Sequence, residues 1–104
     1  MTTLVVLFSL KTDADRAAYE QWAINTDLKT VRTLQSVDRF DVLRSEGLLG
    51  KDDAAPYEYI ELIEVNDMAT FGQEVGTEAM RAVAGEFREF ADNPLFIRCQ
   101  SIEA

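Results

Sequence analysis

Two segments of this chain carry apolar side chains on both faces of an extended strand, and no other feature restricts the fold as much. Residues 2–10, TTLVVLFSL, form an almost continuous apolar run that is rich in β-branched residues. Residues 57–65, YEYIELIEV, carry large apolar groups at both odd and even positions. This composition is typical of strands that are covered on both faces. We therefore predict that both segments are central strands of one sheet.

A kinked helical region is predicted after the first strand. The spacing of apolar residues predicts a helix over residues 13–24, with Thr12 or Asp13 as its N-cap. The sequence NTD, residues 25–27, interrupts this pattern, because Asn and Asp favour local side-chain to backbone hydrogen bonds over a helix interior. A second short helix is expected after the kink. The predicted apolar face comprises Ala14, Ala18 and Trp22, with Tyr19 and Ala23 beside them, before the kink, and Leu28, Val31 and Leu34 after it.

A more polar strand and a loop are predicted in the middle of the chain. Residues 36–44 alternate between two faces and are less apolar than the first strand, which favours a position nearer the sheet edge. Residues 47–56, GLLGKDDAAP, are rich in glycine and aspartate and end in proline, which predicts a mobile loop. One face of this strand is expected to carry Val37, Arg39, Asp41 and Leu43.

The C-terminal part of the chain predicts a second broken helix and a final strand. Asn66 or Asp67 can cap the helix at its start. Gly76 predicts a stop, and Thr77 can serve as a new N-cap for a second helical segment. The last strand is predicted within residues 93–103.

The predicted element order is β-α-β-β-α-β within a single domain, residues 1–104. This order predicts an α+β, ferredoxin-like fold, in which four antiparallel strands form one sheet and two helices cover one of its faces. Because the central strands are apolar on both sides, the uncovered face would leave a large apolar patch in water. We therefore expect a homodimer in which the two bare sheet faces pack together.

Composition excludes several classes of function. The 10 basic and 19 acidic residues give a net charge of -9, which disfavours nucleic acid and anionic membranes as partners. The longest apolar run is too short to span a bilayer, and we expect a cytoplasmic protein. Since the chain has no histidine, Ser-His-Asp and Cys-His arrangements and His-ligated zinc are excluded within one chain. Acid–base chemistry would have to use carboxylates, Tyr or Lys.

Four segments resemble one known family across almost the whole chain. They are YEQWAINTD (residues 19–27), VRTLQSVDRFDV (31–42), YEYIELIEVNDMATF (57–71) and FADNPLFIRCQSIE (90–103). Together they resemble the RedY-like family of dimeric α/β-barrel proteins, whose HapK-type members are encoded in clusters for prodigiosin-type pigments. The resemblance implies a dimeric α/β barrel with a small-molecule pocket between the sheet and the helices of each protomer. Residues 47–55 are the candidate lid of this pocket.

Asp27 and the aromatic residues before it are the first candidate site residues. Trp22 could stack on a flat heteroaromatic molecule and donate one hydrogen bond, although plain core packing is the alternative interpretation. We expect Tyr19, on the same helix, to contact the substrate too. Asp27 is a candidate catalytic carboxylate that could hold a pyrrole or indole N–H, although it could instead be a helix cap. An adjacent Trp would raise the pKa of this carboxyl.

The second candidate group is a row of side chains on the strand of residues 57–65. Tyr57 and Tyr59 are candidate substrate-binding residues, and Glu61 is a candidate catalytic acid. A buried Glu61 would need a partner, for which Arg39 and Arg98 are the candidates, and both are also expected to contact substrate. The three glutamates at 58, 61 and 64 do not predict a metal site, because a spacing of three sends alternate carboxylates to opposite faces.

Three hypotheses for function remain open at this level. The chain could be a cofactor-independent enzyme that acts on a pyrrole-like or bis-aromatic intermediate of secondary metabolism, with Asp27 and Glu61 moving protons. It could be a non-catalytic carrier that uses the same pocket. It could also be a barrel-type monooxygenase or a stress-response dimer, a reading that depends on analogy of fold alone.

Overall fold

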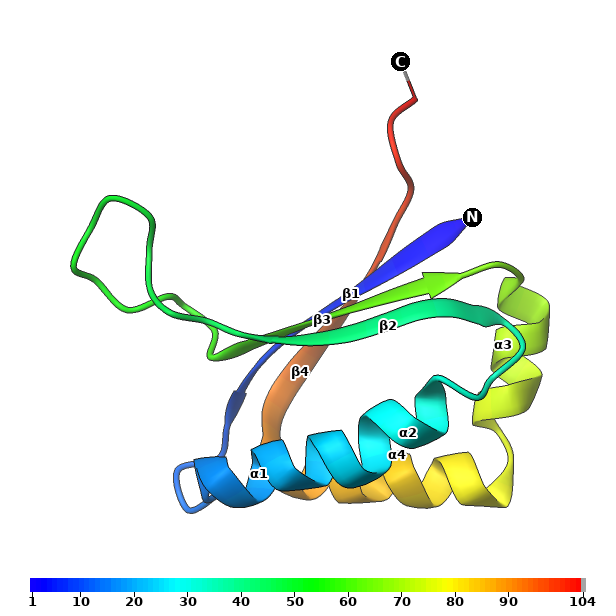
Figure 1. Cartoon of the computed structure of the whole chain (residues 1–104), viewed down its shortest axis with the longest axis horizontal. Coiled ribbons are helices and arrows are strands. Elements are labelled where there is room, and N and C mark those ends of the chain that lie inside the picture. The colour runs from blue at the N-terminus through cyan, green and yellow to red at the C-terminus, as the bar shows by residue number, and fades with distance from the viewer. Residues whose placement is uncertain (104) are drawn as a thin grey trace.

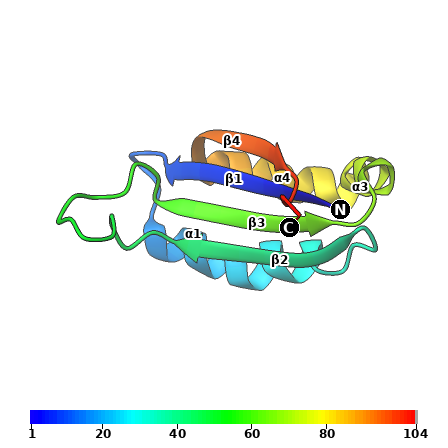
Figure 2. The ribbon, with the colours of Figure 1, turned by 90° about the horizontal axis from the view of Figure 1, so that it is seen from above.

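The computed structural model describes residues 1–103, which form a four-stranded antiparallel sheet with helices on one of its faces (Figure 1). The strand order is β2-β3-β1-β4, so that the two strands predicted to be central are central. Figure 2, seen from above, shows the four strands side by side in front of the helical layer. The strands are β1 (Thr2–Leu10), β2 (Val37–Arg44), β3 (Tyr59–Val65) and β4 (Ala91–Cys99).

The helical layer contains two interrupted helices. The first consists of α1 (Arg16–Trp22), the π-helical segment η1 (Ala23–Asp27) and α2 (Leu28–Val31). The second consists of α3 (Met68–Val75) and α4 (Glu78–Phe90). Figure 1 places α1, α2 and α4 beneath the sheet, while α3 connects the two layers at one end. Within residues 1–103, no helix is both long enough and apolar enough to cross a membrane.

The first helix begins later than its sequence predicts. Asp15, in an extended conformation, is its N-cap, and its carboxylate accepts a hydrogen bond of 3.0 Å from the backbone N–H of Ala17. The prediction of Thr12 or Asp13 as cap was therefore wrong. The predicted apolar face is confirmed for Tyr19 and Ala23, which are buried, but it was wrong for Ala18, which is exposed.

The NTD sequence does not end the helix. The backbone continues through it as a π-helix, and Asp27 keeps helical dihedral angles without any capping hydrogen bond from its side chain. A π-helical turn widens the helix by one residue and is frequent at functional sites. The interpretation of Asp27 as a cap was therefore wrong. In the second helical region, the caps predicted at Asp67 and Thr77 are confirmed.

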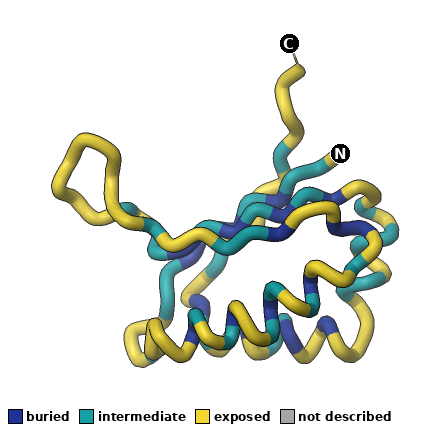
Figure 3. Tube along the Cα trace, viewed as in Figure 1, coloured by how far each residue is buried: buried dark blue, intermediate teal, exposed yellow. Residues whose placement is uncertain are grey.

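The core lies between the sheet and the helices, where buried positions of the trace face each other (Figure 3). Alternate residues of β1, Leu4, Val6 and Phe8, are buried there. In β2 the register shifts between Val37 and Arg39, which indicates a bulge. Because of this bulge, Val37 is buried and does not share the exposed face of Arg39, contrary to the predicted alternation.

The connection between β2 and β3 spans residues 45–58 and extends away from the body of the protein (Figure 1). It includes Tyr57 and Glu58, because β3 begins at Tyr59, two residues later than the sequence predicts. The tip residue Leu49 is fully exposed. The candidate lid, residues 47–55, contributes no lining residue to the two cavities described below.

Candidate acid–base site

An apolar cavity of ≈ 290 Å³ lies between the sheet and the second helical region. Side chains from η1, α2, α3, α4 and three of the strands line it. Most of this lining is aliphatic or aromatic, as expected for a pocket that binds a small organic molecule. The acidic residues of the lining are Asp27 and Glu61, and its basic residue is Arg88.

Local structure explains why the two acids point into this cavity. Glu61 lies on the face of β3 that meets the helices, between the buried residues Tyr59 and Ile63. Asp27 is the last residue of the π-helical segment. It lies on the same buried side of the helix as Tyr19 and Ala23. Asp27 is 6% exposed and Glu61 is 4% exposed. Two carboxyls from elements far apart in the sequence therefore meet away from bulk water.

Burial is the main influence on both carboxyls. It raises the pKa of Asp27 to about 6, and a hydrogen bond with Glu61 lowers that pKa in part. Burial, the charge of Asp27 and the same hydrogen bond all raise the pKa of Glu61 well above its ordinary value. Glu61 therefore keeps its proton, while Asp27 ionises first. The pair holds one acid and one base near neutral pH, as carboxylate dyads do.

Two buried side-chain polar atoms, one in this pair and one beside it, lack hydrogen-bond partners. They are Oε2 of Glu61 and the hydroxyl of Tyr19, among the described residues. Burial, followed by the charges of Glu61 and Asp27, raises the pKa of Tyr19 far above its usual range. Unsatisfied buried polar atoms are uncommon in proteins and often mark sites where a ligand or water completes the hydrogen bonding. The carboxyl pair thus retains unused hydrogen-bonding capacity.

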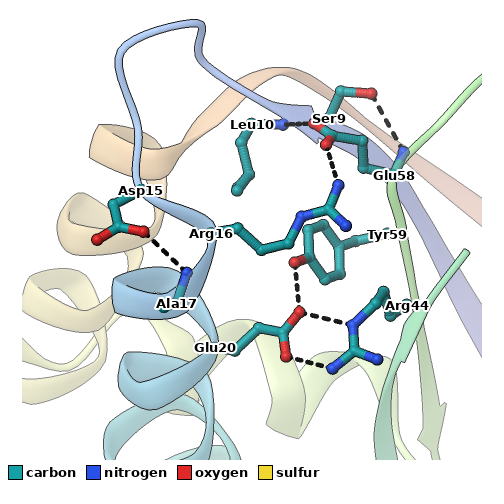
Figure 4. Close-up of polar contacts among 9 residues, drawn as sticks. All are labelled: Ser9, Leu10, Asp15, Arg16, Ala17, Glu20, Arg44, Glu58 and Tyr59. Carbon is teal, nitrogen blue, oxygen red and sulfur yellow. Dashed lines mark hydrogen bonds and ion pairs between the residues drawn. The ribbon is translucent and has the colours of Figure 1, made fainter.

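A second polar cluster, shown in Figure 4, differs because its members are satisfied by one another. The carboxylate of Glu20 accepts hydrogen bonds from Arg44 at 2.7 and 2.5 Å and from the hydroxyl of Tyr59 at 2.7 Å. The contacts with Arg44 and then Tyr59 lower the pKa of Glu20 to about 2. Arg16 donates to Glu58 at 2.5 Å in the same cluster. These contacts connect α1 to the sheet and leave no free acid or base.

The structure separates the sequence-predicted site residues into groups. Asp27 and Glu61 meet in the apolar cavity, a pairing that the sequence did not indicate. Tyr19 and Tyr59 line a different groove, of ≈ 370 Å³, between the first helix and β2. Trp22 lines neither and packs against Phe90, with its indole N–H donating to Glu86 at 2.8 Å.

The predicted arginine partners of Glu61 do not contact it. Arg39 is exposed and donates to Asp41 at 2.6 Å. Arg98 is exposed near the end of β4, opposite Leu4. The expectation of a buried ion pair with either arginine was wrong, because the partner of Glu61 is another acid. Tyr57 is half-buried in the loop before β3 and lines neither cavity.

Sequence reasoning missed the residues at the open end of the cavity, above all Arg88 and Phe96. Ala84 and Arg88 also line it and are four residues apart on α4, so the helical spacing carried a signal for Arg88. Phe96 had no comparable signal, because which face of β4 meets the helices depends on its pairing with β1. Among the described residues, no cluster of three or more acidic or cysteine side chains could hold a metal ion.

Comparison with known proteins identifies the family of this chain. A family model described as REDY-like protein HapK matches residues 2–102. The chain belongs to the REDY-like HapK family. The crystal structure of HapK from Hahella chejuensis is 30% identical and has a TM-score of 0.77, with 100% of this chain and 95% of that chain covered.

More distant structures share the ferredoxin-like fold. Hydroxynitrile lyase from Passiflora edulis is 13% identical, with a TM-score of 0.81 and coverage of 99% of this chain and 94% of that chain. SnoaB from Streptomyces nogalater, a cofactor-independent oxygenase, is 16% identical, with a TM-score of 0.73 and coverage of 99% and 94%. A comparison with curated protein sequences gives no match. At these identities, the two structures indicate the fold alone.

Proposed function

We propose that this HapK-family protein is a cytoplasmic, cofactor-independent acid–base catalyst that acts on a pyrrole-like or bis-aromatic intermediate of a prodigiosin-type pathway. The observation that carries the proposal is the buried pair of Asp27 and Glu61 on the wall of an apolar cavity. A flat, electron-rich ring would be desolvated there beside one protonated and one ionised carboxyl. The choice of pathway rests on the resemblance to HapK-type proteins encoded in pigment clusters, and the description of SnoaB as a cofactor-independent oxygenase supports chemistry without a cofactor on this fold.

The two carboxyls have complementary roles in this proposal. Glu61 donates its proton to a nucleophilic ring carbon or to a carbonyl oxygen of the substrate. The ionised carboxylate of Asp27 stabilises the positive charge that develops on the ring nitrogen and accepts a proton in return. The number of protons on the pair is then unchanged. This exchange is sufficient for a tautomerisation, and it would also assist a condensation in which a carbonyl oxygen leaves as water.

Hydrogen exchange on a model compound tests this proposal directly. In deuterated buffer at neutral pH, we expect the protein to accelerate loss of the C3 proton of 2-methylindole by at least about 100-fold, a typical contribution of general acid–base catalysis. The proton NMR signal of C3 reports the rate. Asp27→Asn and Glu61→Gln should each remove most of the acceleration. Glu64→Gln, an acid on the other face of the same strand, is the matched control and should have no effect.

A carrier function is the second candidate, and the nearly complete burial of both acids favours it. A carrier would use the pair to hold the N–H of a reactive intermediate and shield it from water. In that case 2-methylindole would bind, Asp27→Asn would weaken binding, and the exchange rate at C3 would match that in buffer. If the compound neither bound nor exchanged, both functions would be excluded for this class of ring.

We also propose that the protein acts as a homodimer joined through the bare sheet face. That face carries apolar side chains from all four strands, namely Val5, Leu7, Leu43, Ile60, Leu62, Leu95 and Ile97. A second copy has the same patch, so that an isologous interface could bury both. Burial of several hundred Å² per protomer at about 25 cal/mol/Å² would offset typical association costs.

A further inference from the structure

The cavity that contains the carboxyl pair has a closed end and an open end of opposite character. Asp27 and Glu61 are buried at the closed end. At the open end, Phe96 is 62% exposed and Arg88 is also exposed, while Pro94 is half-buried. A ligand that enters therefore meets a cation and an aromatic ring first and two acids last.

Arg88 forms no ion pair among residues 1–103, as is also true of Arg81 and Arg98, but of these three arginines only Arg88 lines the cavity. Its guanidinium group is therefore available to an anionic ligand at the open end of the cavity. A shallow depression on α4 adjoins the cavity and shares Val75, Ala84 and Arg88 with it. Arg81 lines this depression too, although Glu78 also contributes to it.

This charge arrangement discriminates between the two ends of a ligand. The acids repel an anionic group and attract an N–H donor, while Arg88 attracts an anionic group at the entrance. The guanidinium group of arginine can bind a carboxylate through two parallel hydrogen bonds. A ring that carries an N–H at one end and a carboxylate at the other would enter in a single orientation.

We infer that the natural ligand is a flat N–H heteroaromatic that carries an anionic group at the end opposite its N–H, and that Arg88 binds this group. The inference depends on the proposed function, because it concerns the same cavity. The volume of ≈ 290 Å³ is at the lower end of the range for small-molecule pockets and suits one or two rings. The anionic group would lie outside, over the depression on α4.

A matched pair of probes tests the inference. Indole-5-carboxylate and indole-5-carboxamide have nearly the same shape and the same N–H, and they differ in charge. Isothermal titration should give a Kd for the carboxylate at least about 10-fold lower than for the carboxamide. The preference should decrease with added salt, because the open end of the cavity is accessible to ions.

Variants of two arginines show which residue causes the preference for the carboxylate over the carboxamide. Arg88→Gln should remove the preference for the carboxylate and leave the Kd of the carboxamide unchanged. Arg88→Lys should retain part of it, since the charge remains while the two-pronged geometry is lost. Arg98→Gln removes the same charge from a surface that does not line the cavity, and we expect it to change neither Kd.

The outcomes separate this inference from the proposed function. If neither probe binds, the proposed function is contradicted and the inference with it. If both bind equally, or if Arg98→Gln reduces the preference as much as Arg88→Gln does, the inference is overturned while the cavity remains a binding site. A preference that only the Arg88 variants change would support it.

Discussion

The two faces of the sheet have similar hydrophobicity but opposite environments. On β1, Val6 points toward the helices and is 0% exposed, whereas its neighbour Val5 points away and is only half-buried. The contrast is stronger on β4, where Leu95 and Ile97 are 47% and 42% exposed on the bare face. The helix-covered face includes the buried acid Glu61, which meets Asp27 of the helical layer, while the central part of the bare face is mainly apolar.

This comparison shows that burial does not follow hydrophobicity on either face: acids are buried beneath the covered face, and apolar side chains are exposed on the bare face. The covered face tolerates Asp27 and Glu61 at a cost in stability, which is typical of residues retained for function. The bare face has apolar groups without a cover in the single chain, which is typical of a surface that associates. The following experiments test the comparison, in order of decreasing expected effect.

The largest effect is expected from a charge at the centre of the bare face. Leu62→Lys would place an unpaired cation twice in the proposed symmetric interface, once from each copy, at a cost that would exceed about 5 kcal/mol of association free energy. Sedimentation at low micromolar concentration should show a dimer for the wild type and a monomer for the variant. Leu49→Lys, in the exposed loop, should remain dimeric. A monomeric wild type would refute the proposed dimer.

The next largest effect is expected when a large side chain is removed from the core beneath the covered face, which leaves a cavity and lowers the free energy of unfolding. The ring of Phe8 lies 4.9 Å from that of Phe87 and 5.5 Å from that of Tyr59, measured between centroids. Phe8→Ala should lower the free energy of unfolding by about 3–5 kcal/mol. Denaturant titration measures the change. The matched pair Val6→Ala and Val5→Ala sharpens the comparison: similar losses in both would show that the bare face is buried in solution.

The carboxyl pair should make stability depend on pH. Because burial raises the pKa of Glu61 above its ordinary value of 4.5 and that of Asp27 to about 6, the folded state binds protons more tightly than the unfolded state. The contribution of this pair to the free energy of unfolding is therefore fully present below about pH 4, and it is lost as the pH rises through 6 and above. Glu61→Gln should therefore raise the free energy of unfolding at pH 8 by roughly 1–3 kcal/mol.

Thermal unfolding between pH 5 and pH 8 measures this effect. The variant should have a flatter dependence of Tm on pH than the wild type. Glu64→Gln, on the bare face, serves as the control and should retain the slope of the wild type. An unchanged slope in Glu61→Gln would mean that the pair is not buried as a shared acid and base.

The smallest effect is expected in the loop between β2 and β3, which belongs to neither face. Leu49→Ser should change the free energy of unfolding by less than about 0.5 kcal/mol, because its side chain is fully exposed. We also expect amides of residues 47–55 to exchange fastest among the internal segments, with ligand slowing them if this loop closes over a site. Exchange as slow as in β1 would contradict the prediction of a mobile loop.

The sequence identified individual residues of the candidate site, but it did not predict which of them contact each other. Asp27 and Glu61 were identified because an acid beside apolar or aromatic residues is unusual in a helix or strand. Their contact could not be predicted, since it depends on the π-helical turn that rotates Asp27 toward β3. The bulge in β2, which buries Val37, likewise depends on pairing with β3 and leaves no signal in the local sequence.

By itself, the sequence determined the order of the elements, the central position of β1 and β3, the helix break at Gly76 and the family. The family follows from the resemblance of four segments that span almost the whole chain. The other features depend on the periodicity of apolar residues, on glycine and on local capping, all of which act over a few neighbouring residues. The tertiary structure alone decided which acids contact each other, which arginine lies at the open end of the cavity and which sheet face the helices leave bare. These features depend on the packing of segments that are distant in sequence, where burial and pairing are shared between elements and cannot be assigned from either one.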